Sequence, residues 1–478
     1  MSKETHIPIL RLGEEYHSLD TVELESSADN TVYTHTANPG LIRRDILDLE
    51  KSKAALDAVP AETLAGYCEA AAELFLHEEL PVGNSSQSPQ DYIESLSALT
   101  KLPHTLVKMN MGKVHAAMSQ IRTVIGGLTR NLPLELFDRG LSAVDDLEVN
   151  FYPVADALGV SLPSNAPAVN SLWLPAPVLK IPVLLKPGRE DPFTPLRIVQ
   201  SLIAAGFPKE AFGFYPTTHE GGDTILMGCG RGIAFGSDAT VRKYSGFPSI
   251  QVHGTGRSKV LVGDDYLGKW ADHTETLVES ISANGGRSCI NTSAILVPSG
   301  RDELADAVAR ELAAIEPLPR DHEDALLCGF SNTEWAGSIN DLIDEHLKVE
   351  GAEDVTARYR NGSRLVEMHG QTYLRPTLIS CADPGHPLAN TEFMFPFASV
   401  TEMPQGQMLG EIGETLVVSA WTEDAGWIRD LMNSSDIERL NIGPFPTNRV
   451  QWEQPHEGNL FEFLFRRRAI QGNLAAVS

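Results

Sequence analysis

Residues 281–298 read ISANGGRSCINTSAILVP and combine a glycine turn, a cysteine and an apolar run. Gly285 and Gly286 precede Cys289, and the apolar residues 294–297 predict a buried strand. Glycines let the backbone approach a ligand closely and leave the sulfur accessible. A nucleophilic thiol needs this access, because the thiolate is the reactive form. On spacing alone, a small buried structural cysteine is the commoner interpretation.

The composition is that of a globular protein with more than one core. The chain has 478 residues, 42% hydrophobic and 21% charged, which predicts two or three domains. Its formal net charge of −26 argues against binding to nucleic acid or to an anionic membrane surface. The N-terminus lacks the apolar core of a signal peptide, and no apolar stretch reaches membrane-spanning length. We therefore expect a cytoplasmic protein with no membrane partner.

Cysteine and histidine patterns exclude several kinds of site. The five cysteines are scattered, odd in number and never in a CxxC pair, which is typical of a reduced compartment rather than a disulfide framework or zinc ribbon. The 14 histidines form no ligand cluster at a recognisable spacing, so no metal site is predicted. Because GxGxxG, P-loop, HExxH and GxSxG motifs are also missing, most routine hydrolase, ATPase and metalloprotease functions are disfavoured.

Hydrophobic periodicity divides the chain into a helical first third and an alternating remainder. Residues 1–38 show no clear period and suggest an irregular lead-in, while helical spacing occupies most of residues 40–130, with an interruption near Pro103. Residues 134–153 suggest an irregular or strand-like arm. Beyond them a helix is predicted over 195–205, stopped by Gly206. Strands are predicted at 157–162, 183–185, 212–215, 224–227, 232–235, 259–262 and 416–420.

Strands that alternate with helices predict a mostly parallel sheet covered on both faces. Such sheets bind ligands beyond the carboxyl ends of their strands. The C-terminal tail carries three consecutive arginines, Arg466 to Arg468. In an acidic chain these could form an anion site, although a solvated or ion-paired face is the more common role of such a cluster.

Six short motifs follow one another along the chain: PSNAP at 163–167, VLLKP at 183–187, FGS at 235–237, GRS at 256–258, GRSC at 286–289 and EFMFP at 392–396. As an ordered set they resemble the aldehyde dehydrogenase superfamily, although no single motif is specific. The resemblance extends from about residue 151 to residue 396. It favours Cys289 as a nucleophile, because its Gly-Arg-Ser-Cys run is similar to the family's Gly-Gln-x-Cys.

The resemblance implies an α/β, aldehyde-dehydrogenase-like fold with a Rossmann-type cofactor domain, an α/β catalytic domain and an oligomerisation arm. The implied boundaries are 1–133 with 154–255 for the NAD(P)-binding domain, 256–440 for the catalytic domain, and 134–153 with 441–478 for the arm segments. The resemblance also implies a homodimer or homotetramer, and a small-molecule aldehyde or acyl-thioester as substrate.

The family chemistry assigns roles to individual residues. Cys289 would attack an aldehyde carbonyl to give a thiohemiacetal, whose oxyanion the Asn165 amide and the Cys289 backbone N–H would stabilise. Hydride transfer to NAD or NADP would leave a thioester on the sulfur. Lys186 would hold the adenosine ribose, Gly236 and Ser237 would meet the pyrophosphate near a helix start, and Glu392 would bind the nicotinamide ribose.

Two departures from the family pattern leave alternatives open. Hydrolytic members carry a glutamate where this chain has His253, which could serve as the base or be a bystander. Members that pass the acyl group to coenzyme A also lack that glutamate, so a coenzyme A-acylating enzyme is the first alternative. A catalytically silent dinucleotide-binding protein is the second. Arg189 replaces the usual NAD-binding glutamate and favours NADP, because a guanidinium can pair with a 2′-phosphate.

Overall fold

The computed structural model describes residues 3–24, 30–144 and 147–472, and these fall into two compact units. Unit 1 comprises residues 1–99, 108–254 and 451–478, and unit 2 comprises residues 100–107 and 255–450, apart from the residues outside the described ranges. Unit 2 includes residues 100–107 and 255, which the sequence-based boundaries assign to the cofactor domain, and residues 441–450, which they assign to the arm. Residues 145–146 and 473–478 of the predicted arm lie outside the described residues.

Unit 1 is built on a seven-stranded sheet in which five neighbouring strands run parallel. Along the sheet these are β14 (Ile250–His253), β13 (Gly230–Phe235), β10 (Ala157–Ser161), β11 (Val183–Lys186) and β12 (Phe212–Phe214). The antiparallel strands β2 (Ile9–Arg11) and β3 (Glu14–Tyr16) extend it beyond β12. The strands predicted at 157–162, 183–185, 212–215 and 232–235 are therefore confirmed.

Helices cover this sheet because each buries an apolar face. Ile42 and Leu49 pack with Ala157, Leu184 and Ile225 in one buried cluster. The helices of unit 1 are α1 (Pro39–Leu47), α2 (Leu49–Asp57), α3 (Ala61–His77), α4 (Pro89–Thr100), α5 (His104–Ser119), α6 (Ile121–Thr129), α7 (Leu136–Arg139), α8 (Pro175–Val178), α9 (Phe193–Ala205), α10 (His219–Gly228), α11 (Asp238–Tyr244) and α17 (Leu460–Leu464), the first residues of α5 and the last of α4 belonging to unit 2.

The predicted helices over 91–130 are confirmed as α4, α5 and α6. Gly206 ends α9 as predicted, with a φ of 117° that a side chain would strain. Two predictions are wrong. Residues 224–227 belong to α10 rather than to a strand, and the described part of residues 1–38 contains β1 (Lys3–Ile7), β4 (Thr21–Leu24) and β5 (Asn30–His35) in a small sheet.

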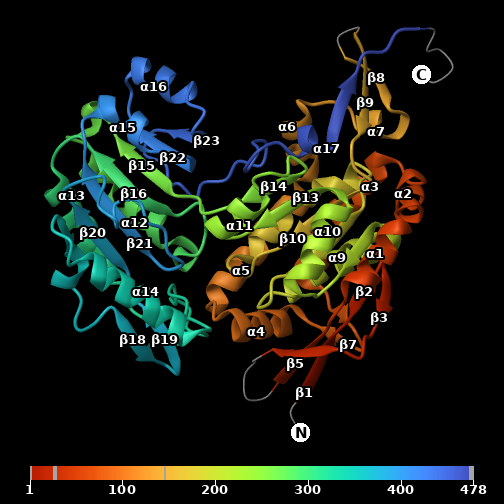
Figure 1. The fold of residues 1–478 in the computed structure, drawn as a ribbon, viewed down its shortest axis with the longest axis horizontal. Coiled ribbons are helices and arrows are strands. Elements are labelled where there is room, and N and C mark those ends of the chain that lie inside the picture. The colour runs from red at the N-terminus through yellow and green to blue at the C-terminus, as the bar shows by residue number, and fades with distance from the viewer. Residues whose placement is uncertain (1–2, 25–29, 145–146, 473–478) are drawn as a thin grey trace. The chain divides into compact units, whose positions relative to one another are not determined.

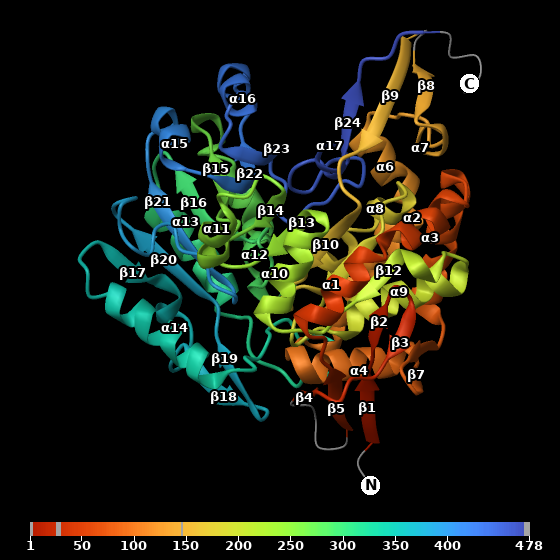
Figure 2. The same ribbon diagram turned by 45° about the vertical axis from the view of Figure 1, so that its right-hand side comes forward.

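The arm of unit 1 is a three-stranded antiparallel sheet that joins distant parts of the chain. It contains β8 (Leu141–Val144), β9 (Leu147–Pro153) and β24 (Phe465–Arg468), and β24 is seen beside β9 in both ribbon views (Figures 1 and 2). The three consecutive arginines are thus exposed residues of a strand. The short hairpin of β6 (Leu80–Val82) and β7 (Ser85–Gln87) completes the strands of the unit.

Unit 2 is a second seven-stranded sheet, parallel except at one edge. Its order is β17 (Ala352–Asp354), β20 (Thr377–Cys381), β21 (Phe397–Glu402), β16 (Thr292–Val297), β15 (Ser258–Val262), β22 (Thr415–Trp421) and β23 (Ile437–Ile442), and a separate hairpin contains β18 (Leu365–Met368) and β19 (Gln371–Leu374). Its helices are α12 (Thr274–Ser282), α13 (Arg301–Leu312), α14 (Thr333–His346), α15 (Gln405–Glu411) and α16 (Ala425–Met432).

Successive side chains of β15 point to opposite faces of the sheet, as the two-residue period of a strand requires, and so they enter two different cores. Val260 and Val262 pack against α12 and α13, whereas Leu261 packs against α15 and α16. Helices therefore cover both faces of this sheet, which confirms the predicted α/β class. Among the described residues, no helix combines the length and apolarity that crossing a bilayer requires.

Candidate active site

Cys289 follows a tight glycine turn and precedes the central strand β16. The turn is a 3₁₀ helix, Ala283–Gly286, in which Gly285 and Gly286 have φ values of 65° and 70°. A Cβ on Gly286 would lie 2.3 Å from the backbone of Phe395 and Pro396, so no other residue fits there. The glycines thus let the turn pack closely against a second loop and support the backbone of the cysteine.

Cys289 is also the most accessible of the five cysteines. It is partly exposed, whereas Cys68, Cys229, Cys328 and Cys381 are buried. Burial raises the pKa of each of these four thiols, that of Cys381 to about 12. Because the thiolate is the nucleophile, the four buried cysteines are inert near neutral pH.

A second turn, residues 256–258, holds the backbone of the cysteine. The Ser258 hydroxyl donates a hydrogen bond of 2.9 Å to the carbonyl oxygen of Cys289. A Cβ on Gly256 would lie 1.9 Å from that same oxygen, so the contact depends on glycine. Arg257, between them, has a φ of 44°, which is uncommon for a residue with a side chain. The Gly-Arg-Ser motif therefore positions the candidate nucleophile.

The same turn holds Glu392. One carboxylate oxygen, Oε2, accepts a 2.6 Å hydrogen bond from the backbone N–H of Arg257. The other, Oε1, is buried without a hydrogen-bond partner among the described residues. Burial raises the pKa of Glu392 to about 7, against the opposing effect of the Arg257 hydrogen bond and charge. A buried carboxylate oxygen that can still accept a hydrogen bond is suited to bind a hydroxyl group of a ligand.

Lys259 is a buried lysine next to this turn, and its role was not predicted from the sequence. Its side chain is 2% exposed, and Nζ donates to the Arg257 carbonyl oxygen at 2.7 Å and to Thr415 Oγ1 at 3.0 Å. Burial, and then the Arg257 charge, lower the pKa of Lys259 to about 7, while Glu392 opposes them. A lysine directly before the apolar run Val260–Val262 was the available signal.

Arg439 lies near the sulfur and was also missed. It sits on β23 opposite Val417 of β22, and Cys289 packs against the cluster that contains Val417 and Leu416. Arg439 Nη2 donates a 2.6 Å hydrogen bond to the carbonyl oxygen of Arg449. Burial lowers the pKa of Arg439, and the negative charge of a Cys289 thiolate opposes that effect. The guanidinium is thus close enough to interact with the sulfur electrostatically.

Unit 1 contributes a pocket of about 470 Å³ at the carboxyl ends of β10, β11 and β13. This is where open parallel sheets bind their ligands. Lys186 is half-buried there, and burial lowers its pKa. The lining residues are Ser161, Leu162, Pro163, Ser164, Lys186, Gly188, Arg189, His219, Gly222, Asp223, Leu226, Ala234, Phe235, Ala239, Thr240, Lys243 and Tyr244.

Charges in this pocket are mixed. Arg189 is exposed, and Lys243 pairs with Asp223 at 2.6 Å. Burial favours a higher pKa for Asp223, but hydrogen bonds from Lys243 and Tyr244 outweigh it and keep that pKa below its ordinary value. Two of the lining residues, Gly188 and Ser164, are packed closely, because a Cβ on Gly188 would lie 2.3 Å from Ser164 Oγ.

The remaining predicted residues of unit 1 lie around the same strand ends. Ser237 is the N-cap residue of α11, and a Cβ on Gly236 would lie 2.2 Å from Thr240 Oγ1. Asn165 is half-buried in the loop that follows β10. Unit 1 therefore brings Lys186 and Arg189 into one pocket, while unit 2 links Cys289 and Glu392 through the 256–258 turn.

His253 ends β14 and is 7% exposed. Its Nδ1 is hydrogen-bonded to Glu457 Oε2, and its ring stacks on Phe235 with centroids 4.7 Å apart. Its Nε2 is buried and has no hydrogen-bond partner among the described residues. Glu457 was not predicted from the sequence, because it is separated from His253 by 204 positions.

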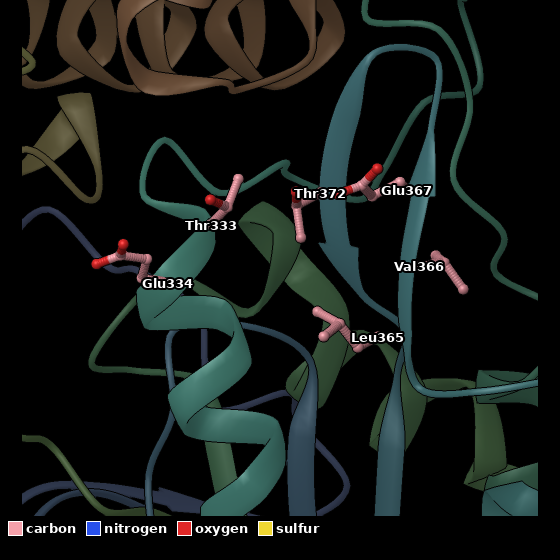
Figure 3. A pocket seen from close by; sticks show the side chains of 6 residues that line it. All are labelled: Thr333, Glu334, Leu365, Val366, Glu367 and Thr372. Atoms are coloured by element: carbon pink, nitrogen blue, oxygen red, sulfur yellow. The ribbon is translucent and has the colours of Figure 1, made fainter.

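A second pocket, on unit 2, is lined by residues without an activated nucleophile. A pocket of about 440 Å³ lies between the first turn of α14, with Thr333 and Glu334, and the β18–β19 hairpin, with Glu367 and Thr372 (Figure 3). Its side chains are two threonines, two carboxylates and two aliphatic residues, none of which is an activated nucleophile. Within the described ranges, no group of three or more His, Cys, Asp or Glu residues is placed to hold a metal ion.

Comparison with known proteins supports one family. The sequence model of the aldehyde dehydrogenase family matches residues 107–448. A curated relative from Staphylococcus haemolyticus, also named an aldehyde dehydrogenase, is 24% identical over 231 residues. That match covers 46% of this chain and 47% of the relative, so the chain spans about half the length of the curated relative it matches.

Solved structures support the fold. An aldehyde dehydrogenase structure from Burkholderia cenocepacia has a TM-score of 0.78 at 17% identity, covering 97% of this chain and 96% of that one. An NAD-dependent benzaldehyde dehydrogenase from Corynebacterium glutamicum has a TM-score of 0.75 at 16% identity, covering 96% and 97%. An indole-3-acetaldehyde dehydrogenase complexed with NAD+ has a TM-score of 0.78 at 16% identity, covering 97% and 96%. With a family match that spans well over half of the sequence, from α5 through Cys289 and Glu392 to β23, the chain belongs to the aldehyde dehydrogenase family.

Proposed function

We propose that the protein is an NAD(P)-dependent oxidoreductase that oxidises an aldehyde through a covalent intermediate on Cys289. One observation carries the proposal. In a member of this family, the one partly exposed cysteine has its backbone held by a glycine turn and by Ser258. The turn that positions it also binds Glu392, the proposed ribose acceptor. A nucleophile and a ligand acceptor thus share one rigid support.

The residues present fit a dinucleotide cofactor. Lys186 suits the adenosine ribose hydroxyls, and Gly236 with Ser237 suits the pyrophosphate. The buried Oε1 of Glu392 lacks a partner in the described part of the chain, and a ribose hydroxyl would supply the missing donor. When bound, the dinucleotide supplies the hydride acceptor. Neighbours solved with NAD+ agree with this class of cofactor.

We further propose a preference for NADP over NAD. Arg189 is exposed at the rim of the pocket on unit 1, and Lys243 lines the same pocket. A guanidinium can bind a 2′-phosphate with two hydrogen bonds, whereas a carboxylate at that place would repel it. Asp223 is already neutralised by Lys243, so its charge opposes the phosphate only weakly.

The protein residues have separate roles in the reaction. The sulfur of Cys289 forms a bond to the aldehyde carbon, and the carbonyl oxygen becomes an oxyanion. The Asn165 amide and the Cys289 backbone N–H are the proposed donors to that oxyanion, each worth about 3 kcal/mol of barrier. After oxidation the acyl group remains on the sulfur as a thioester. His253 is the proposed base for its release to water, in place of the family's glutamate.

Loss of that glutamate also favours a second function, transfer of the acyl group to coenzyme A. A thiol ionises more readily than water, so it needs less help from a base. The proposed substitute base, His253, is hydrogen-bonded through Nδ1 to Glu457, and this contact supports hydrolysis as the first candidate. The two functions differ in the acyl acceptor and share every earlier step.

A cofactor screen tests both functions. Purified protein is mixed with NAD+ or NADP+ and a panel of aldehydes, with and without coenzyme A, and reduced cofactor is followed by absorbance. Turnover in water that coenzyme A does not stimulate supports hydrolysis, and turnover that requires coenzyme A supports acylation. Cys289→Ser must abolish either activity, with Cys381→Ser as the matched control. Absence of cofactor reduction under every condition would instead identify a catalytically silent member.

We also propose that the protein assembles as a homodimer or homotetramer, as the family resemblance implies. The arm of β8, β9 and β24 is the proposed contact surface, and its outer strand carries three exposed arginines. Analytical ultracentrifugation of the protein and of Arg467→Glu measures this directly. A monomer at micromolar concentration would contradict the proposal.

A further inference from the structure

The C-terminal segment brings a carboxylate to the end of β14. Residues 455–459 read PHEGN, and Glu457 Oε2 forms a hydrogen bond with His253 Nδ1. The histidine is 7% exposed and its side-chain partner is 20% exposed, so both lie largely away from bulk water. The two side chains are thus held together in largely buried surroundings, where a hydrogen bond is electrostatically stronger than in water.

Several contacts fix Glu457 in place. Gln251 Nε2, two residues before the histidine, donates a 2.8 Å hydrogen bond to the Glu457 carbonyl oxygen. Gly458 has a φ of 66°, and a Cβ there would lie 2.4 Å from that same amide nitrogen. Asn459 Nδ2 then donates to the Leu128 carbonyl oxygen at 2.9 Å. The loop is therefore anchored at the glutamate's own carbonyl group and again two residues beyond it.

These contacts determine which nitrogen of the imidazole is basic. An ionised carboxylate can only accept hydrogen bonds, so Nδ1 must carry the proton that is shared with Glu457. In the neutral ring the lone pair is then on Nε2. That atom is buried and lacks a partner in the described part of the chain, while stacking on Phe235 restricts rotation of the ring. A buried polar atom without a partner calls for an explanation, and a ligand or water at Nε2 would provide one.

We propose that Glu457 is a positioning residue that orients His253 and fixes its tautomer, so that Nε2 serves as the base for acyl release. This inference rests on the proposed function. The oxygen of a water molecule forms a bond to the thioester carbon while its proton moves to Nε2. The carbon–sulfur bond then breaks, and Cys289 leaves as a thiolate. No oxidation or reduction occurs in this step.

The alternative role for Glu457 is purely structural, as an anchor for the C-terminal segment. Transient kinetics with Glu457→Gln and Glu457→Asp separate the two, with the exposed Glu453→Gln in the same segment as the matched control. For a positioning role, Glu457→Gln keeps a rapid first burst of reduced cofactor but loses steady-state turnover by about 10²-fold, the usual size of base catalysis. Glu457→Asp restores most of that loss, and KM for the aldehyde stays within about twofold.

The kinetic result can overturn the inference in two ways. An unchanged kcat in Glu457→Gln would exclude a role in release. Equal loss of burst and turnover, without recovery in Glu457→Asp, would point to an anchor alone. Coenzyme A should accelerate turnover of Glu457→Gln more than that of wild type, because a thiol depends less on the base. Equal acceleration of both proteins would count against the inference.

A spectroscopic measurement keeps the test independent of turnover. The protein is labelled with ¹⁵N-histidine, and the His253 signals are identified by their loss in His253→Asn. Wild type should show the Nδ1–H tautomer, and Glu457→Gln should show a different tautomer distribution. An unchanged tautomer would overturn the inference even if the enzyme is active. If wild type shows no aldehyde oxidation at all, the proposed function fails, while the tautomer still reports whether Glu457 controls the ring.

Discussion

Replacing Lys259 by methionine should change how stability depends on pH. The ammonium is 2% exposed on the strand that supports the 256–258 turn, and its hydrogen bonds are to Arg257 and Thr415. Burial lowers its pKa from 10.5 to about 7. A methionine of similar length fills the same space without a charge, so it removes the cost of burying the ammonium together with two hydrogen bonds.

The magnitude follows from linkage. Between about pH 7 and pH 10.5 the unfolded chain holds the lysine proton and the folded chain does not, so the free energy of unfolding rises with pH. One pKa unit corresponds to about 1.4 kcal/mol, which gives a full effect of about 5 kcal/mol over the whole window. From pH 7 to pH 9 the stability of wild type relative to Lys259→Met should rise by about 2 kcal/mol.

Urea denaturation at several pH values, followed by tryptophan fluorescence, measures this difference. The control is Lys269→Met, an exposed lysine of the same unit, which should show a flat difference between the same pH limits. Glu392→Gln provides the opposite sign. The pKa of Glu392 is raised to about 7, so its contribution to stability is lost as pH rises from about 4.5 to 7. A pH-independent difference between wild type and Lys259→Met would contradict a lowered pKa for Lys259 in the folded protein.

Three further predictions concern the nucleophile and the cofactor. Gly256→Ala should reduce kcat at least tenfold and lower the free energy of unfolding by about 1–3 kcal/mol. The reason is that the new Cβ would lie 1.9 Å from the Cys289 carbonyl oxygen. Normal kinetics would contradict the described contact. Arg189→Gln should raise KM for NADP+ about tenfold and leave KM for NAD+ nearly unchanged, whereas equal effects on both cofactors would exclude a 2′-phosphate contact. Arg439→Gln should slow alkylation of Cys289 by iodoacetamide at neutral pH several-fold, because a nearby cation favours the thiolate. Arg439→Lys should recover part of that rate. An unchanged rate would show that the guanidinium does not influence the sulfur.

Local patterns predicted the parts of the fold that depend on local chemistry. Gly206 ends α9 because only glycine adopts its φ without strain, and the apolar run 294–297 forms most of the central strand β16. The strand predicted at residues 224–227 was wrong. Thr224 and Ile225 are β-branched and favour strands in isolation, but the segment packs as α10, with Ile225 buried in the core of unit 1.

Contacts between distant segments could not be predicted from local patterns. The pairing of β24 with β9 and the hydrogen bond between His253 and Glu457 each join residues that are more than 200 positions apart. A lysine in a strand is expected at the surface unless both faces of the sheet are known to be buried. The burial of Lys259 was therefore not predicted. Likewise, the position of Arg439 near Cys289 follows only from the pairing of β23 with β22, which the sequence does not show.

Mass spectrometry can detect directly whether Cys289 carries the acyl group during turnover. The protein is mixed with NADP+ and an aldehyde that it oxidises, quenched in acid within one turnover, digested, and its cysteine peptides are weighed. We expect the mass of the acyl group on the peptide containing Cys289, a larger fraction of it in Glu457→Gln, and none in Cys289→Ser. Reduced cofactor without any acylated cysteine, or acylation of one of the four buried thiols instead, would contradict the proposed mechanism.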